Sequence, residues 1–219
     1  MALDIWWISG SPYAWWVLLA AEVKGLAYEG HMLSKTKGEN RTPEYLAMNP
    51  RGRVPLIKDG DFILSESMAI VAFLDAKSAK TPLFGSDPRD AAKVWEAVCQ
   101  VLSDLQRDVF ADLILSGRAR ADDPEPIRES AAKLRSGLGF FEERLASTSY
   151  LCGDRLSAAD LALLPFLLFN LRAASRDIAR NLDLGIMPLA DGYPRLAAFA
   201  RRIERLPGYD RTYPPHWRC

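Results

Sequence analysis

Few cysteines and histidines occur in this sequence of 219 residues, which has neither an excess of one charge nor a long apolar run. The cysteines Cys99, Cys152 and Cys219 are widely separated. This spacing fits a reducing compartment and argues against a disulfide framework or a Cys-x-x-Cys redox pair. Neither His31 nor His216 has a Glu or Cys partner at helical spacing, so we expect no metal site.

The charge balance argues against a polyanionic partner. Lys plus Arg number 28 and Asp plus Glu number 28, giving a formal net charge of zero, so no overall field favours nucleic acid or an anionic membrane. The apolar runs are too short or too interrupted to span a bilayer. The start, from Met1 to Trp6, lacks a basic region followed by a long apolar one. We therefore expect a cytoplasmic protein.

The sequence also lacks the short motifs of several enzyme classes. It contains no Gly-x-Ser-x-Gly, no phosphate-binding loop and no dinucleotide fingerprint. These absences argue against a hydrolase, a kinase or a dehydrogenase of the kinds that use such motifs.

The pattern of the first 78 residues predicts a small α/β domain. Asp59-Gly60 between two short apolar runs is typical of a hairpin, and Thr42-Pro43-Glu44 is typical of a helix start. The expected elements are a strand over 3–8, a helix over 14–24, a strand over 26–33, a short helix through 48, strands over 54–58 and 62–64, and a helix from 68. This order predicts a thioredoxin-like arrangement.

The stretch around the hairpin suits an anionic ligand that is also a peptide. In Ser65-Glu66-Ser67 a hydroxyl residue stands where a helix cap belongs. The helix start and the Ser67 hydroxyl can receive a carboxylate, and Glu66 can receive an ammonium group. Val54 precedes a proline, is therefore held extended, and can offer its backbone to an extended peptide.

The rest of the chain predicts a linker over 79–88 and an all-helical domain over 89–219. Apolar stripes over 89–117 and 126–145 indicate two long helices. Ser157, with Asp160 three positions on, forms a capping box that opens a mostly apolar, buried helix, and Pro165 should kink this helix. A final amphipathic helix over 194–206 precedes an aromatic tail that ends at Trp217.

Five features in order resemble the cytosolic glutathione S-transferase family: Ser11-Pro12-Tyr13, Val54-Pro55, Glu66-Ser67, the linker and the Ser157 box. The resemblance implies a thioredoxin-like domain followed by a helical domain. It also implies a cis Val54-Pro55 bond, a Val54 backbone that pairs with the cysteinyl unit of glutathione, and a Glu66-Ser67 pair that holds the γ-glutamyl end. It implies a homodimer with a role in detoxification.

Ser11 is the residue on which the catalytic prediction depends. The Ser-Pro-Tyr motif resembles the serine motifs of the tau and zeta classes, which implies that the Ser11 hydroxyl binds the glutathione sulfur. Lowering a thiol pKa by roughly two units needs about 2.7 kcal/mol. A hydrogen bond to a charged group supplies about 1.5–3 kcal/mol. The alternatives are that Ser11 only shapes a turn, or that Ser9 or Tyr13 contacts the sulfur.

Other positions are candidates for the remaining contacts. Arg53 takes the place of a residue that, in related classes, reaches the glycine end of glutathione, and its guanidinium can pair with that carboxylate. Arg172 falls where the zeta class has a substrate-binding arginine, although Trp16 stands where that class has another arginine. The candidates for an electrophile site are Tyr13, Trp15, Arg107, Phe110, Ile114 and Arg172. Apolar residues at these spacings more often form a core.

The function expected from these features is a glutathione transferase in which the activated thiolate of glutathione attacks a small hydrophobic electrophile. Two alternatives remain open. One is a non-catalytic module of the same fold that binds a ligand or takes part in a stress response. The other is a glutathione-dependent isomerase or ether-cleaving enzyme, because the fold does not determine the reaction.

Overall fold

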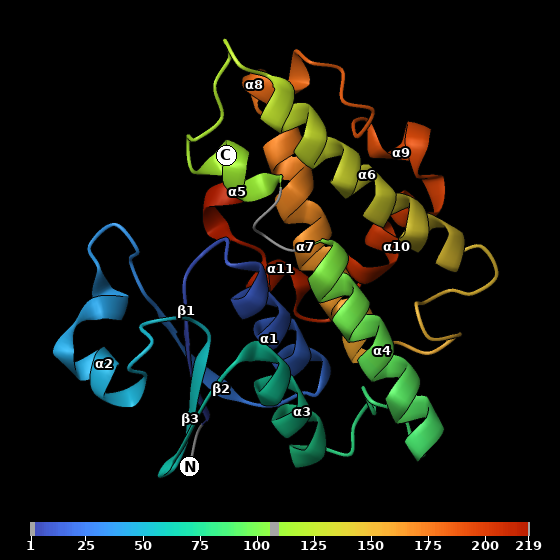
Figure 1. The fold of residues 1–219 in the computed structure, drawn as a ribbon. Coiled ribbons are helices and arrows are strands. Elements are labelled where there is room, and N and C mark those ends of the chain that lie inside the picture. Colours follow the sequence, from blue (N-terminus) through green and yellow to red (C-terminus); the bar gives the residue numbers. More distant parts are fainter. Residues whose placement is uncertain (1–2, 106–109, 219) are drawn as a thin grey trace. The chain divides into compact units, whose positions relative to one another are not determined.

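The computed structural model describes residues 3–105 and 110–218. It divides into unit 1, comprising Met1–Phe84 and Arg205–Cys219, and unit 2, comprising Gly85–Glu204 (Figure 1). The expected helical domain reached residue 219, whereas the structure groups the last fifteen residues of the chain, Arg205–Cys219, with the first unit. The two units are described separately below.

Unit 1 is built on a mixed four-stranded sheet. Its strands are β1 (Leu3–Trp7), β2 (Tyr28–Met32), β3 (Leu56–Asp59) and β4 (Phe62–Ser65), in the order β2-β1-β3-β4. β1 is parallel to β2 and antiparallel to β3, and β3 is antiparallel to β4. The helices are α1 (Pro12–Val23), α2 (Pro43–Met48) and α3 (Ser67–Lys77), with a 3-10 turn η1 (Glu39–Arg41). This arrangement confirms the thioredoxin-like prediction.

Local chemistry explains the boundaries of several of these elements. The Thr42 hydroxyl accepts a hydrogen bond from Tyr45 N at 3.3 Å, and Pro43 occupies the first turn of α2. Gly60 has a φ of +69° in the turn between β3 and β4, a conformation that glycine adopts without steric cost. β3 begins at Leu56 rather than at Val54 as expected, because Pro55 has no N–H to donate to a strand ladder.

A buried ion pair attaches the segment after α3 to unit 1. Lys24 Nζ lies 2.6 Å from Asp75 Oδ1 and donates to the Thr81 carbonyl at 3.1 Å. Asp75 also accepts a hydrogen bond from Leu83 N at 2.8 Å. These contacts satisfy a lysine side chain that is fully buried.

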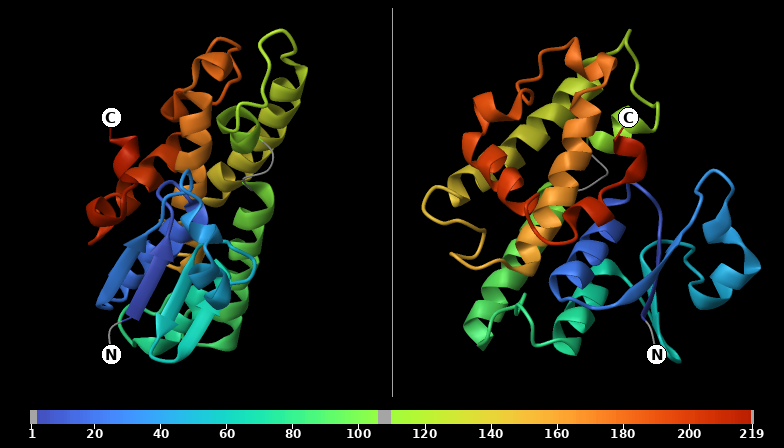
Figure 2. Two further views of the ribbon diagram at one scale, coloured as in Figure 1. Left: turned by 90° about the vertical axis from the view of Figure 1, so that its left-hand side faces the viewer. Right: turned by 180° about the vertical axis from the view of Figure 1, so that it is seen from behind.

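The C-terminal segment also packs on unit 1. It contains α11 (Tyr209–Thr212) and a 3-10 turn η2 (Pro215–Trp217). The indole N–H of the buried Trp15 in α1 donates to Thr212 Oγ1 at 3.1 Å. Figures 1 and 2 show this red segment beside the blue helix α1.

Unit 2 is helical in the part of the chain that the structure describes. Its helices are α4 (Pro88–Asp104), α5 (Ala111–Leu115), α6 (Glu125–Arg144), α7 (Ala158–Ala174), α8 (Asp177–Arg180), α9 (Leu189–Gly192) and α10 (Pro194–Ile203). α7 packs against α4, α5 and α10. The expectation of one long helix over 89–117 was wrong, since α4 ends at Asp104 and α5 is a separate short helix. The expected helix over 126–145 is confirmed by α6.

The predicted capping box at the start of α7 is confirmed. Asp160 Oδ2 accepts hydrogen bonds from Ser157 N at 2.8 Å and from the Ser157 hydroxyl at 2.6 Å. Its other carboxylate oxygen accepts from Leu151 N at 2.8 Å. Asp160 is fully buried, and this burial raises the pKa of its carboxyl to about 6. α7 continues through Pro165 and is buried along most of its length.

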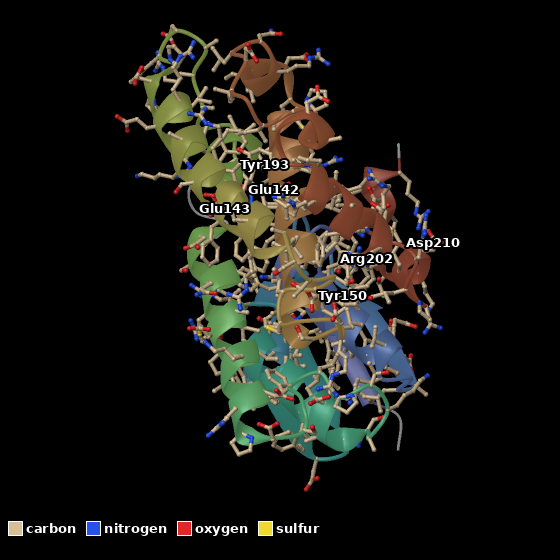
Figure 3. The ribbon with its side chains drawn as sticks, turned by 90° about the vertical axis from the view of Figure 1, so that its right-hand side faces the viewer. Glu142, Glu143, Tyr150, Tyr193, Arg202 and Asp210 are labelled. Atoms are coloured by element: carbon tan, nitrogen blue, oxygen red, sulfur yellow. The ribbon has the colours of Figure 1, made fainter. Side chains whose placement is uncertain are left out.

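A second buried carboxylate orders the start of α10. Glu142 of α6 accepts hydrogen bonds from the backbone N–H groups of Arg195 and Leu196, both at 2.9 Å, and so satisfies donors that a helix start leaves unpaired. Figure 3 shows Glu142 next to Tyr193, and Tyr150 next to Arg202. Of the helices that the structure describes, none combines the length and apolar character that crossing a membrane requires.

Candidate functional site

Three segments of unit 1 meet at one edge of the sheet. Leu56, the first residue of β3, pairs with Trp6 near the end of β1 and with Ser65 at the end of β4. The turn after β1, the loop before β3 and the start of α3 therefore lie at the same edge. This register brings together the sequence-predicted residues Ser11, Val54-Pro55 and Glu66-Ser67.

Two side-chain hydrogen bonds hold the loop before β3 in place. Tyr45 Oη and Asn49 Nδ2 both donate to the Arg53 carbonyl, at 2.6 and 2.8 Å. Burial raises the pKa of Tyr45 to about 12, so its hydroxyl remains a donor at neutral pH. The Val54-Pro55 peptide bond is cis, as the family resemblance implied. The side chain of Arg53 is exposed next to this fixed loop.

Glu66 and Ser67 stand at the start of α3, but in a different way from that expected. Ser67 is the first helical residue and is 7% exposed, whereas Glu66 occupies the cap position with a φ of +72°. The expectation that a serine hydroxyl caps α3 was wrong, because the cap residue is Glu66 and its side chain makes no capping hydrogen bond. The turn at Glu66 projects its carboxylate outward, where 59% of the side chain is exposed.

Arg51 is a site residue that the sequence analysis missed. Its Nη1 forms a short ion pair with Glu66 Oε1, and both side chains are more than half exposed. Only the folding of the hairpin brings the two residues together. The local pattern Pro50-Arg51-Gly52 carries no periodicity or spacing that would have pointed to Glu66.

Ser11 is the N-cap residue of α1. Its hydroxyl oxygen accepts a hydrogen bond from Ala14 N at 3.3 Å. A hydroxyl that accepts one bond still has a proton to donate, so this cap is compatible with a contact to a ligand. Ser9 Oγ, in contrast, lies 2.7 Å from His216 Nδ1. Tyr13 is half-buried in the first turn of α1.

Three of the residues expected to contact an electrophile are buried. Trp15 is 2% exposed and packs in the core of unit 1, while Phe110 and Ile114 are 1% and 7% exposed in unit 2. The three side chains therefore have packing roles in their own units. Arg172 is half-buried in the last turn of α7. Arg107 lies outside the described residues.

Two further observations concern the Cys152 thiol and the side chains that commonly bind metals. Burial raises the pKa of the Cys152 thiol above its ordinary value, so this thiol stays protonated and unreactive at neutral pH. Over residues 3–105 and 110–218, the side chains of His, Cys, Asp and Glu form no group of three or more that would hold a metal ion.

Comparison with known proteins identifies the family. Residues 10–77 match the glutathione S-transferase N-terminal domain, and residues 124–202 match the glutathione S-transferase C-terminal domain. Glutathione S-transferase 4 of Zea mays is 36% identical over 166 residues, which cover 73% of this chain and 73% of that protein. A probable glutathione S-transferase of Oryza sativa subsp. japonica is 33% identical over 201 residues, covering 87% of each chain.

A solved structure extends the likeness to the whole chain. The crystal structure of a glutathione S-transferase from the Antarctic clam Laternula elliptica superposes with a TM-score of 0.84 at 29% identity, covering 100% of this chain and 94% of that one. Two domain matches in the expected order, relatives above 30% identity and this structural agreement point to the same conclusion. The chain belongs to the glutathione S-transferase family.

Proposed function

We propose that this protein is a glutathione transferase that lowers the pKa of the glutathione thiol and directs the thiolate to a hydrophobic electrophile. The observation that carries the proposal is the meeting of Ser11, the Val54-Pro55 loop and the start of α3 at one edge of the sheet. Each segment supplies a different polar group within unit 1. Together they suit a peptide that carries an ammonium group, a carboxylate and a thiol.

Glutathione binding is assigned to the groups at this edge. The backbone of Val54 pairs with the cysteinyl unit, while the helix start at Ser67 receives the γ-glutamyl carboxylate, helped by the helix dipole. The Glu66 carboxylate, which pairs with Arg51 in the free protein, binds the ammonium group of glutathione. The ammonium group therefore replaces Arg51 as its partner. Arg53 pairs with the glycine carboxylate. An exposed ion pair such as Arg51–Glu66 is worth about 0–1 kcal/mol, so its exchange costs little.

The chemistry is assigned to Ser11. Its hydroxyl donates a hydrogen bond to the sulfur, and the thiol proton leaves to solvent. A charge-assisted hydrogen bond of about 1.5–3 kcal/mol and a helix terminus of about 0.3–1 kcal/mol account for a shift of roughly two pKa units. The sulfur electron pair then forms a carbon–sulfur bond, and the leaving group departs with the electrons of the bond that breaks. Within unit 1, Tyr13 remains a candidate for a contact to the electrophile.

Assembly and location follow the family in this proposal. We propose a homodimer in the cytosol that acts on small hydrophobic electrophiles in detoxification. Sedimentation of the purified protein tests the dimer directly, and a monomer at micromolar concentration would contradict it.

The decisive experiment follows the ultraviolet thiolate band of glutathione bound to the purified protein as pH is varied. We expect the band well below the free thiol pKa of about 8.5 in the wild type, and its displacement to higher pH in Ser11→Ala. Because Ser11 also caps α1, Ser11→Gly is the matched control, since glycine is tolerated at a helix N-cap nearly as well as serine but has no side-chain donor. Ser11→Thr retains both functions.

The variants separate the competing assignments. Loss of the band in Ser11→Ala and Ser11→Gly, with retention in Ser11→Thr, would support a sulfur contact. A band that survives in Ser11→Gly would reduce Ser11 to a capping residue, and parallel measurements on Ser9→Ala and Tyr13→Phe would then identify the contact. Glutathione binding without any band would indicate a non-catalytic module. Failure to bind glutathione would overturn the proposal.

A further inference from the structure

The C-terminal segment Tyr209–Trp217 is anchored on unit 1 by an aromatic cluster around Trp15. The ring centroids of Tyr209, Tyr213 and Trp217 lie 6.0, 5.4 and 5.7 Å from that of Trp15, and the last two contacts are edge-to-face. Edge-to-face geometry is a favourable arrangement of aromatic rings. The Trp15 indole N–H adds a hydrogen bond of 3.1 Å to Thr212. The segment is therefore packed against α1.

A polar anchor reinforces this packing at the other end of α1. Arg211 forms a short ion pair with Glu22, and Tyr28 Oη donates to the same Glu22 oxygen at 2.8 Å. Burial and the neighbouring Glu22 carboxylate raise the pKa of Tyr28, so its hydroxyl stays protonated. Gly208, with a φ of +80°, turns the chain into α11 close to the Glu22 side chain.

From these anchors the segment reaches the turn that carries Ser11. His216 Nδ1 lies 2.7 Å from Ser9 Oγ. A Cβ atom at Gly10 would lie 2.8 Å from His216 Cε1 and 3.2 Å from Trp217 Nε1, so both rings cover Gly10 closely. Gly10 has a φ of +81°. The turn from Ser9 to Ser11 thus contains a residue with large backbone freedom, and the C-terminal segment limits that freedom.

We propose that His216 is a positioning residue of the active site, which holds the turn from Ser9 to Ser11 so that the Ser11 hydroxyl meets the glutathione sulfur. This inference rests on the proposed function. The bond from Ala14 N to Ser11 Oγ is long, at 3.3 Å, so the cap alone orients the hydroxyl weakly. A reacting group performs best when contacts behind it fix its orientation. The Ser9–His216 bond and the ring over Gly10 supply such contacts.

The test substitutes His216, an exposed residue, so its variants should fold as the wild type does. His216→Phe keeps a ring over Gly10 but removes the hydrogen bond, whereas His216→Asn keeps a hydrogen-bonding atom near the position of Nδ1. Arg218→Ala is the matched control, because Arg218 directly follows this segment but contacts Asp210 and Tyr213 rather than the turn. The readouts are the pKa of bound glutathione, its dissociation constant and kcat/KM with one electrophile.

We expect His216→Phe to raise the pKa of bound glutathione and to lower kcat/KM about three- to tenfold, as the loss of one hydrogen bond implies. Glutathione affinity should change much less, because the groups that bind its carboxylates lie elsewhere. His216→Asn should recover most of the loss, and Arg218→Ala should match the wild type.

A double-mutant cycle separates positioning from a direct role of Ser9. If Ser9 acts through His216, the effects of Ser9→Ala and His216→Phe will not add in the double variant, because both remove the same bond. Additive effects would assign Ser9 its own contact and overturn the inference. Wild-type thiolate formation with an unchanged pKa in His216→Phe would overturn this inference alone. Absence of the thiolate band in the wild type would overturn the proposed function, and this inference with it.

Discussion

Trp15 and Trp16 are neighbours in α1 and both are buried, yet their indole N–H groups meet different surroundings. Trp15 donates to Thr212 Oγ1 at 3.1 Å. The N–H of Trp16 has no hydrogen-bond partner among the residues that the structure describes. A buried donor without an acceptor costs about 1–3 kcal/mol. Trp16 therefore contributes to stability through its volume alone, whereas Trp15 also holds the C-terminal segment.

This contrast predicts different costs for the same substitution. Trp15→Phe should lower the free energy of unfolding by about 1 kcal/mol more than Trp16→Phe, because only the first variant loses a hydrogen bond and the second removes an unpaired donor. Urea denaturation of the two variants, monitored by circular dichroism, measures the difference. Equal costs, or a larger cost for Trp16→Phe, would contradict this account of the two indoles.

At the scale of elements, the start of α7 was predictable because its determinants are local. The Ser157 and Asp160 side chains satisfy each other's backbone groups within one turn of helix, so the sequence alone contained the whole motif. The stripe over 89–117 was harder to interpret. Its apolar spacing continued past Leu105, but the structure ends α4 at Asp104, and spacing does not report where a helix stops.

The buried cap of α7 makes a prediction about pH. Burial raises the pKa of Asp160 to about 6, while an unfolded aspartate titrates near pH 3.9. Between these pH values the folded state therefore binds more protons than the unfolded state. The stabilisation that the protonated Asp160 carboxyl gives the folded state is complete below about pH 3.9 and is lost as the pH rises through 6. Relative to Asp160→Asn, the wild type should lose roughly 2 kcal/mol of unfolding free energy between pH 4 and pH 7.

Urea denaturation at a series of pH values and constant ionic strength tests this prediction, with the exposed Asp191→Asn as a control for general charge effects. A difference between wild type and Asp160→Asn that stays constant with pH would show that the three donors to the carboxylate outweigh its burial. The hydrogen-bonded ionised form would then persist throughout the range.

At the scale of the whole molecule, the last residues of the chain belong with the first ones. Arg205–Cys219 form a compact unit with Met1–Phe84, although the sequence places them after the helical segments. The sequence indicated an aromatic tail but gave no reason to pair it with α1. Aromatic residues provide the driving force for packing on any apolar surface, and their spacing does not identify that surface.

Deletion of residues 209–219 should therefore destabilise unit 1 more than unit 2. We expect faster amide hydrogen exchange in α1 than in the intact protein, with a loss of stability on the order of 3 kcal/mol from the exposed Trp15 face and the broken hydrogen bond. Amides of α7 should change little. Hydrogen exchange followed by mass spectrometry resolves the two helices, and equal acceleration in both would contradict the assignment of the segment to unit 1.

The sequence by itself determined the features that depend on neighbours along the chain: the hairpin at Gly60, the caps at Thr42 and Ser157, and the order of strands and helices. These features follow from hydrogen bonds and backbone angles within a few residues. They were sufficient to predict the fold class and to place Ser11, Val54 and Glu66 near one edge of a sheet.

Only the tertiary structure decided which distant side chains meet, at that edge and elsewhere in unit 1. The Arg51–Glu66 pair spans 15 positions in sequence, Lys24–Asp75 spans 51 and Ser9–His216 spans 207. Such contacts depend on the path of the whole chain, because any of several charged or polar residues satisfies the same local pattern. The residue types at the site could therefore be predicted from the sequence. The distant side chains that hold them in position could not.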